Sequence, residues 1–206
     1  MKPFNEMASL EVINKTVESL KQNGIDAIVA ENSVDAKIKI YELLPKGSEV
    51  MMMTSETLRA IGVEQEINAS VDYVALKQKI AGMGDDKARE KKQMGSAPEI
   101  AIGSVHAVTE DGVVLIASNT GSQLPAYLYG ADKVVWVVGA QKLVKDTEEG
   151  IKRIYEYVLP LETVRARKAY NLPETWHSNV SKLVEVKKEI AKDRIKMVIV
   201  KEVLGF

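Results

Sequence analysis

The amino-acid sequence predicts an open α/β fold, with a mostly parallel sheet, helices on both of its faces and one antiparallel hairpin. Two observations predict the parallel sheet. Helix-like and strand-like segments alternate through the first half of the chain, and the strand-like runs 25–30 and 48–53 are short and mainly apolar, as strands buried on both faces are. A third observation, Asp111-Gly112 between two apolar runs, indicates the hairpin.

The first half of the chain supplies the alternation. Residues 5–23 place Leu10, Ile13 and Val17 mainly on one helical face, and Asn23-Gly24 is typical of a helix C-terminus. The next elements are expected in the order strand, helix, strand, helix, at residues 25–30, 33–44, 48–53 and 54–61.

Residues 64–98 are more polar than the segments around them. We expect helices here, with a break at 82–86 and a further short helix at 86–93. The charge run AREKKQ indicates a solvated helix face rather than a nucleic-acid patch. A segment of this kind can be mobile and can cover a site.

Strand-like runs return in the second half. They are expected at 99–102, 105–109, 113–118 and 133–138, followed by helices at 146–157 and 161–170 and by strands at 180–186 and 195–203. Pro160 is expected to separate the two helices. We expect the last two strands to pair with each other through the loop around 191–193.

Length and composition indicate one α/β domain over residues 1–206 that can bury a core without disulfides. The 28 Lys and Arg residues nearly balance 29 Asp and Glu residues, so we expect no general attraction to nucleic acid or membrane. The chain contains no cysteine, which excludes a cysteine-bound iron–sulfur cluster and thiolate catalysis. No signal peptide or long apolar segment is visible, and a cytoplasmic location is expected.

A polar loop between two apolar runs is the first candidate site. It contains Ser118, Asn119, Thr120, Gly121, Ser122 and Gln123. The following residues, 123–129, can start a helix, and a strand, a polar loop and a helix N-terminus together can bind an anion. The alternative is an ordinary turn built from residues that turns prefer.

Glu110 is the candidate catalytic residue, as a nucleophile, a general base or an acceptor for a substrate hydroxyl. Strand alternation places His106 on the same face as Glu110, so the two side chains can share a site. The alternatives are an exposed hairpin corner for Glu110 and a structural role for His106. Two distant histidines, His106 and His177, make no metal site.

Further candidates follow two expected strands. Thr54, Ser55 and Thr57 come directly after the strand at 48–53, and Lys142 follows the strand at 133–138. Ligands of open α/β sheets bind beyond the carboxyl ends of strands, so these side chains can hold an anionic ligand. A helix cap and a surface lysine are the alternatives.

Several motifs make the sequence resemble the LUD-domain family, which includes lactate-utilization protein C. They are Glu110-x-Gly112, Ser118-Asn119-x-Gly121 and Val137-Val138-Gly139 with Lys142-Leu143-Val144, and the stretches VLPLETVRARKAY and VIVKEVLGF resemble short stand-alone members. The resemblance covers essentially the whole chain, most clearly residues 99–206.

The resemblance implies a fold like that of ribose-5-phosphate isomerase, glucosamine-phosphate deaminase and coenzyme A transferases. It implies a part in the use of lactate or a related small organic acid, with a small anionic ligand and without a cofactor of its own. It also implies iron–sulfur partner proteins, and a homo-oligomer is a further expectation. For Glu110 it implies the position of the acyl-accepting glutamate of coenzyme A transferases. Two alternatives stay open: an accessory or sensor subunit of a lactate-oxidising complex, and a transferase-like enzyme or a binder of a nucleotide or folate-type ligand.

Overall fold

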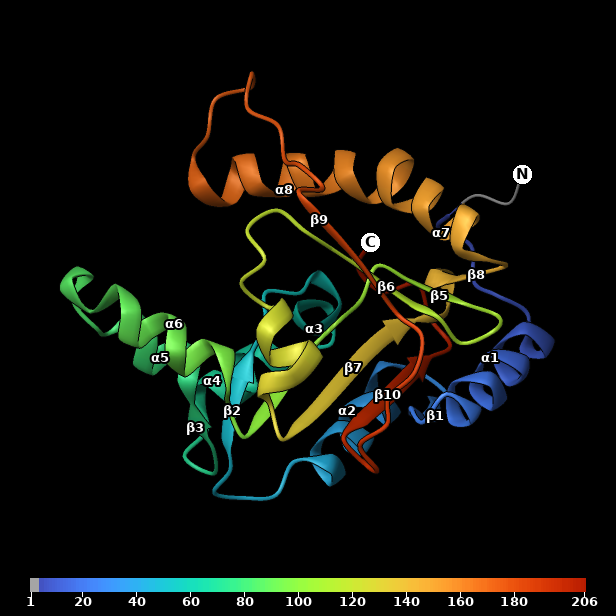
Figure 1. Ribbon diagram of the computed structural model, residues 1–206, viewed down its shortest axis with the longest axis horizontal. Helices are drawn as coiled ribbons and strands as arrows, with labels where there is room; N and C mark the ends of the chain where they lie inside the picture. The colour runs from blue at the N-terminus through green and yellow to red at the C-terminus, as the bar shows by residue number, and fades with distance from the viewer. Residues whose placement is uncertain (1–3) are drawn as a thin grey trace.

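The computed structural model describes residues 4–206 and has two sheets (Figure 1). The main sheet is parallel throughout, with the strand order β1-β10-β7-β4-β2-β3. Its strands are β1 (Asp26–Ala30), β2 (Glu49–Met52), β3 (Val74–Ala75), β4 (Ile100–Gly103), β7 (Lys133–Gly139) and β10 (Ile195–Val200). The predicted α/β class with a mostly parallel sheet is confirmed.

The second sheet is mixed and contains the predicted hairpin. Its order is β8-β5-β6-β9, with the strands β5 (Ala107–Thr109), β6 (Val114–Ser118), β8 (Leu143–Val144) and β9 (Lys182–Val186). β5 and β6 are antiparallel, and Gly112 between them has a φ of 81°, which favours glycine.

Helices cover the main sheet on one face, and a helix together with the second sheet covers the other. The helices in the first half are α1 (Leu10–Gln22), α2 (Ser33–Leu43), α3 (Glu56–Ala60), α4 (Val63–Ala69), α5 (Leu76–Ala81), the 3-10 turn η1 (Asp85–Lys87) and α6 (Ala88–Ser96). Ile40 of α2 and Ile67 of α4 share a core with Val135 of β7. On the opposite face, Ile13 of α1 and Val108 of β5 pack with Trp136 of β7.

The second half of the chain adds an outer layer. Its helical elements are the π turn η2 (Ala126–Gly130), the 3-10 turn η3 (Ala140–Lys142), α7 (Thr147–Arg153), the π turn η4 (Ile154–Val158) and α8 (Leu159–Tyr170). Ile154 packs with Leu115 and Ala107 of the second sheet, and Figure 1 shows α7 and α8 on the far side of that sheet from β7 and β10.

The expectation that Pro160 separates two helices is wrong. Residues Thr147–Tyr170 form consecutive helical turns, with η4 between α7 and α8. In η4 the Leu159 N–H donates to Ile154 O, one residue further back than in an α-helix, and Pro160 then stands in the first turn of α8. An N–H in the first turn of a helix has no acceptor within that helix, so Pro160, which lacks an N–H, is tolerated there.

The expected pairing of the last two strands is also wrong. β10 lies between β1 and β7 in the main sheet, whereas β9 pairs antiparallel with β6 in the second. The burial of the two strands explains the difference. Five of the six residues of β10 are buried, as in the centre of a parallel sheet, whereas β9 has no buried residue and lies at an edge.

The segment 64–98 contains the expected helices and also the short strand β3, which pairs with β2 at the edge of the main sheet. None of the helices within residues 4–206 combines the length and the apolarity that a membrane-crossing segment requires.

Candidate functional site

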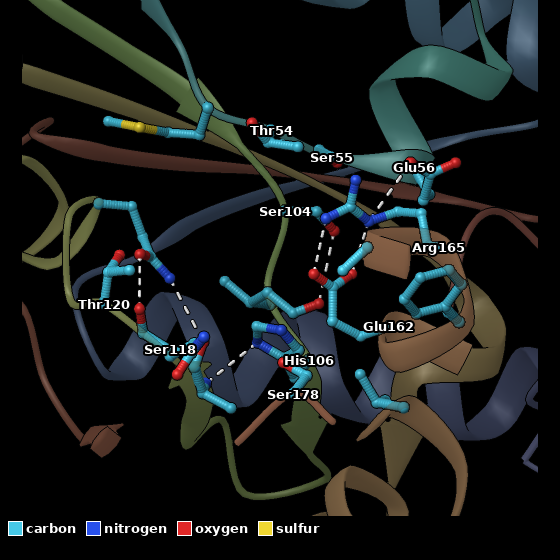
Figure 2. Close-up of a pocket in the computed structure, with 18 of the residues that line it drawn as sticks. Thr54, Ser55, Glu56, Ser104, His106, Ser118, Thr120, Glu162, Arg165 and Ser178 are labelled. Atoms are coloured by element: carbon cyan, nitrogen blue, oxygen red, sulfur yellow. Dashed lines mark hydrogen bonds and ion pairs between the residues drawn. The ribbon is translucent and has the colours of Figure 1, made fainter. Parts of the chain in front are cut away.

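Polar side chains gather where three neighbouring strands of the main sheet end. Thr57 lies on α3 after β2, Ser104 follows β4, and Lys142 follows β7. Because β4 lies between β2 and β7, these strand ends are adjacent. They line one end of a cavity of about 400 Å³, shown in Figure 2. This edge is where open α/β sheets bind ligands.

Lys142 is the central group at this inner end of the cavity. Its Nζ atom donates to Thr57 Oγ1 at 2.9 Å, to Ser104 Oγ at 3.0 Å and to the carbonyl oxygen of Val105 at 3.3 Å. The residue is 2% exposed. Within residues 4–206 no ion pair includes Lys142, so all of its partners are uncharged oxygens.

The electrostatics of the inner end disfavour a cation and favour an anion. Burial lowers the pKa of Lys142 well below its usual range, and the nearby guanidinium of Arg153 lowers it further. Arg153 is fully buried and its Nη1 atom donates to the carbonyl oxygen of His106 at 2.5 Å. A carboxylate beside Lys142 would compensate positive charge at this end of the cavity.

The segment after β10 holds Thr57 in place. The Thr57 hydroxyl donates to the carbonyl oxygen of Leu204 at 3.1 Å, and the same oxygen accepts from Gln141 Nε2 at 2.9 Å. Gly205 follows with a φ of 62°, and a Cβ atom there would lie 2.7 Å from the Thr57 nitrogen. Phe206 then lines the cavity. These residues end the stretch VIVKEVLGF, but no sequence pattern indicated that they belong to the site, because their contacts join segments far apart in the chain.

His106 lines the cavity as a neutral imidazole. Burial, the positive charge of Lys142 and that of Arg153 together lower its pKa to about 3. Its Nδ1 atom accepts from the Ala117 N–H at 3.1 Å, so the proton of the neutral ring is on Nε2. The hydrogen bond joins the start of the hairpin to β6 and gives His106 a structural role as well as a place in the cavity wall.

The polar loop 118–123 contributes residues to the cavity wall and also forms hydrogen bonds within itself. The lining residues are Ser118, Asn119, Thr120, Ser122 and Gln123, without Gly121. The Gly121 N–H donates to Ser118 Oγ at 2.8 Å, and Ser118 donates to Gln123 Oε1 at 2.9 Å. The expected helix after the loop is only the π turn η2. Two N–H groups of the loop, those of Gly121 and Ser122, donate to hydroxyls of the loop itself, and the anion site stays a prediction.

The structure does not bring Glu110 to the cavity. The Glu110 carboxylate accepts from Lys15 Nζ of α1 at 2.8 Å, and its N–H donates to Val144 O. Thr54 and Ser55, in contrast, line the cavity with Thr57 as expected, and Ser55 Oγ also caps α3 by accepting from the Leu58 N–H at 3.3 Å. His106 and Glu110 are therefore not partners in one site.

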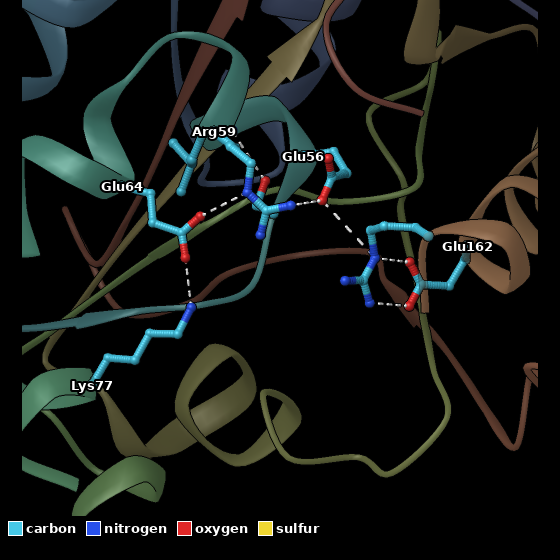
Figure 3. A network of polar contacts seen from close by, with 8 residues as sticks. Glu56, Arg59, Glu64, Lys77 and Glu162 are labelled. Carbon is cyan, nitrogen blue, oxygen red and sulfur yellow. Dashed lines mark hydrogen bonds and ion pairs between the residues drawn. The ribbon is translucent and has the colours of Figure 1, made fainter. Parts of the chain in front are cut away.

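The outer end of the cavity carries a network of ion pairs, shown in Figure 3. Arg165 of α8 forms two hydrogen bonds with Glu162, at 2.6 and 2.7 Å, and its Nε atom lies 3.9 Å from Glu56 Oε1 of α3. The carboxylate of Glu162 raises the pKa of Arg165. Glu64 accepts from Lys77 at 2.6 Å. Helix-surface charges of this kind carry no sequence signal, so the network was not predicted.

Ser104 was also not predicted as a site residue. It directly follows β4, so the rule that selected Thr54, Ser55 and Thr57 applies to it as well. Among residues 4–206 there is no group of three or more His, Asp or Glu side chains that could hold a metal ion.

Together, the fold and the site define an α/β protein with a polar, lysine-centred cavity at the strand ends. The chain matches the LUD domain over residues 13–200 and belongs to this family. Family membership supports a role related to lactate utilization in general. No curated protein matches the chain.

Among solved structures, the chain is similar to a DUF162 family protein from Deinococcus radiodurans. The two are 9% identical and have a TM-score of 0.56, over 95% of this chain and 99% of the other. That likeness supports the fold. A second structure, eIF2B beta from Chaetomium thermophilum, has a TM-score of 0.35 and 14% identity over 68% of this chain and 46% of its own.

Proposed function

We propose that this protein binds a small organic acid of the lactate and pyruvate class at the inner end of the cavity, with Lys142 as its main contact. One observation carries the proposal. Lys142 is a buried amine in a cavity wall, and no carboxylate pairs with it within residues 4–206. A buried lysine without a counter-ion is costly, and a ligand carboxylate would remove that cost.

The neighbouring groups suit such a ligand. The hydroxyls of Thr57 and Ser104 contact Lys142 Nζ, and the Ser104 hydroxyl can turn to donate to a ligand oxygen or to accept from a ligand hydroxyl. Hydroxy and oxo acids carry a carboxylate next to a second oxygen, so Lys142 Nζ and the Ser104 hydroxyl would each have a ligand oxygen as a partner. The cavity is larger than a three-carbon acid, and the remainder, toward Arg165, leaves room for water or for a longer acid.

Anion binding at this position is linked to protonation. Because burial lowers the pKa of Lys142, the neutral amine is more favoured in the isolated site than it is in water. A carboxylate next to Nζ favours the ammonium form and raises that pKa. We therefore expect binding to take up a proton and to weaken as the pH rises.

Isothermal titration of pyruvate and of L-lactate tests this proposal. We expect Lys142→Met to abolish binding, since the methionine side chain has similar length and no charge. Lys145→Met is the matched control, because Lys145 is three residues away, exposed and outside the cavity wall. A ligand at 100 times its dissociation constant should stabilise the wild type by about 2.7 kcal/mol. Unchanged binding in the Lys142 variant would remove Lys142 from the site.

A further inference from the structure

We propose that Lys142 is a catalytic residue that forms an imine with the carbonyl carbon of a 2-oxo acid. This inference rests on the proposed function and deepens it, because it selects oxo acids over hydroxy acids as the reacting ligand. The geometry that carries it is a primary amine in the wall of a cavity, with uncharged oxygens as its only hydrogen-bond partners among residues 4–206.

Imine formation requires a neutral amine with an accessible lone pair. Among residues 4–206 no protein carboxylate holds Lys142 in the ammonium form. The ligand carboxylate favours that form, so a proton must pass from Nζ to the carbonyl oxygen before the lone pair can attack. Burial and the charge of Arg153 act in the same direction and lower the pKa of Lys142. Other lysines differ: Lys15, Lys46 and Lys196 have their pKa raised by carboxylate partners.

The partners of Nζ also tolerate the neutral form. A neutral amine donates two hydrogen bonds and accepts one. Thr57 Oγ1 at 2.9 Å accepts from Nζ, because its own proton goes to Leu204 O, whereas the hydroxyl of Ser104, with Oγ at 3.0 Å, can turn to donate to a neutral Nζ. The carbonyl oxygen of Val105 accepts at 3.3 Å. Hydroxyl groups next to the nitrogen can also pass protons between it and the oxygen of a bound carbonyl group.

The step balances without an oxidant or reductant. The lone pair of Lys142 Nζ attacks the carbonyl carbon, a C–N bond forms, and the carbonyl electron pair moves to oxygen. Protons pass from nitrogen to that oxygen, which leaves as water, and a C=N double bond remains. Counting the proton taken up with the ligand, Nζ carries three protons, of which two leave in the water and one stays on the imine nitrogen. One positive charge therefore remains next to the ligand carboxylate. Lactate has no carbonyl group and can occupy the site without reacting.

Reductive trapping tests the imine. The full chain is incubated with pyruvate at pH 7 and sodium cyanoborohydride, which reduces imines, and the modified lysines are located by peptide mass spectrometry. We expect Lys142 to be modified at least about tenfold faster than exposed Lys145, because the neighbouring hydroxyls can transfer protons during imine formation. L-lactate should protect Lys142 and form no adduct.

Calorimetry of the same protein separates this inference from the proposed function. Pyruvate that binds in a Lys142-dependent way without an adduct at Lys142 overturns the imine and leaves the proposed function standing. The absence of both binding and adduct overturns both. Labelling of Lys142 and Lys145 at equal rates also overturns the imine. A Lys142→Arg variant keeps a positive charge but forms no imine, so it should bind pyruvate without being trapped at position 142.

Discussion

At the scale of single residues, the site depends on ionisable groups whose pKa burial lowers. His106 and Lys142 both lie at the cavity, and burial makes the positively charged form of each less favourable. His106 also makes a hydrogen bond that suits its neutral form, because its Nδ1 atom accepts from the Ala117 N–H. Such shifts gather at functional sites more often than elsewhere, and they make the protein's stability depend on pH.

We predict that His106 makes the protein less stable as the pH falls from 6.5 toward about 3. Its pKa is about 3 in the folded chain and near 6.5 in the unfolded chain. Between these values the unfolded chain binds the extra proton, so the free energy of unfolding falls with pH. Urea unfolding at several pH values measures this dependence. His106→Asn keeps an acceptor for the Ala117 N–H but does not titrate, so its stability should fall less steeply. Parallel pH curves for the two proteins would contradict the assignment.

For Glu110 we expect little effect on ligand binding or on stability. Its carboxylate pairs with exposed Lys15, outside the cavity. Glu110→Gln should therefore leave pyruvate affinity within about twofold and change the stability by less than about 1 kcal/mol, as is usual for exposed ion pairs. Calorimetry and urea unfolding check the two values. A large loss of affinity would return Glu110 to the site.

Gly103 shows how closely backbone and side chains approach behind the cavity. A Cβ atom at this position would lie 1.8 Å from the hydroxyl oxygen of Tyr127 and 3.0 Å from Cβ of Met53. We predict that Gly103→Ala costs about 1–3 kcal/mol of stability, as overpacking does. Tyr127→Phe removes the nearest atom, so the double variant should lose less stability than the two single changes add up to. Additive losses in urea unfolding would show that the contact is relieved in another way.

At the scale of elements, the sequence predicted where the buried strands lie in the chain better than it predicted which strands pair with each other. β7 and β10 are apolar runs whose composition indicates burial, and both lie in the centre of the main sheet. The pairing of β9 with β6 depends on contacts between segments more than 60 residues apart, which local patterns do not contain. The π turn η4 was not predicted either. Proline breaks a helix in its interior, where the missing N–H and the clash of its ring are costly, whereas Pro160 lies in the first turn of α8.

The candidate site was predictable where it follows strand ends. Thr54, Ser55, Thr57 and Lys142 were found by that rule and line the cavity. Arg153 and the segment that ends in Phe206 were not found, because what brings them to the site is tertiary packing.

The cap of α3 links an element to the site. Ser55 Oγ accepts from the Leu58 N–H at the start of the helix that carries Thr57. Ser55→Ala should cost about 1 kcal/mol of stability and also weaken pyruvate binding. Ser9→Ala is the matched control: Ser9 caps α1 through the Val12 N–H and does not line the cavity. Equal effects of both changes on affinity would show that the cap does not act through Thr57.

At the scale of the whole molecule, the cavity lies between layers that different parts of the chain provide. α3 comes after β2 of the main sheet, and α8 belongs to the outer helical layer. The Glu56–Arg165–Glu162 contacts connect these two layers across the outer end of the cavity (Figure 3). An anion that enters the cavity from this end passes two carboxylates and one guanidinium.

This arrangement predicts how charge controls the rate of ligand entry. Arg165→Gln leaves the carboxylates of Glu56 and Glu162 without their arginine partner, and we expect slower association of pyruvate, by roughly a few fold at low salt. Glu162→Gln has the opposite charge effect and should speed association. Both effects should shrink as ionic strength rises, because the Debye length falls to about 8 Å at 0.15 M. Stopped-flow measurements at two salt concentrations test this, with Lys145→Met as a control for a change in net charge away from the cavity. Association rates that follow net charge alone, so that the control slows entry as much as Arg165→Gln does, would show that the ion-pair network does not guide the ligand.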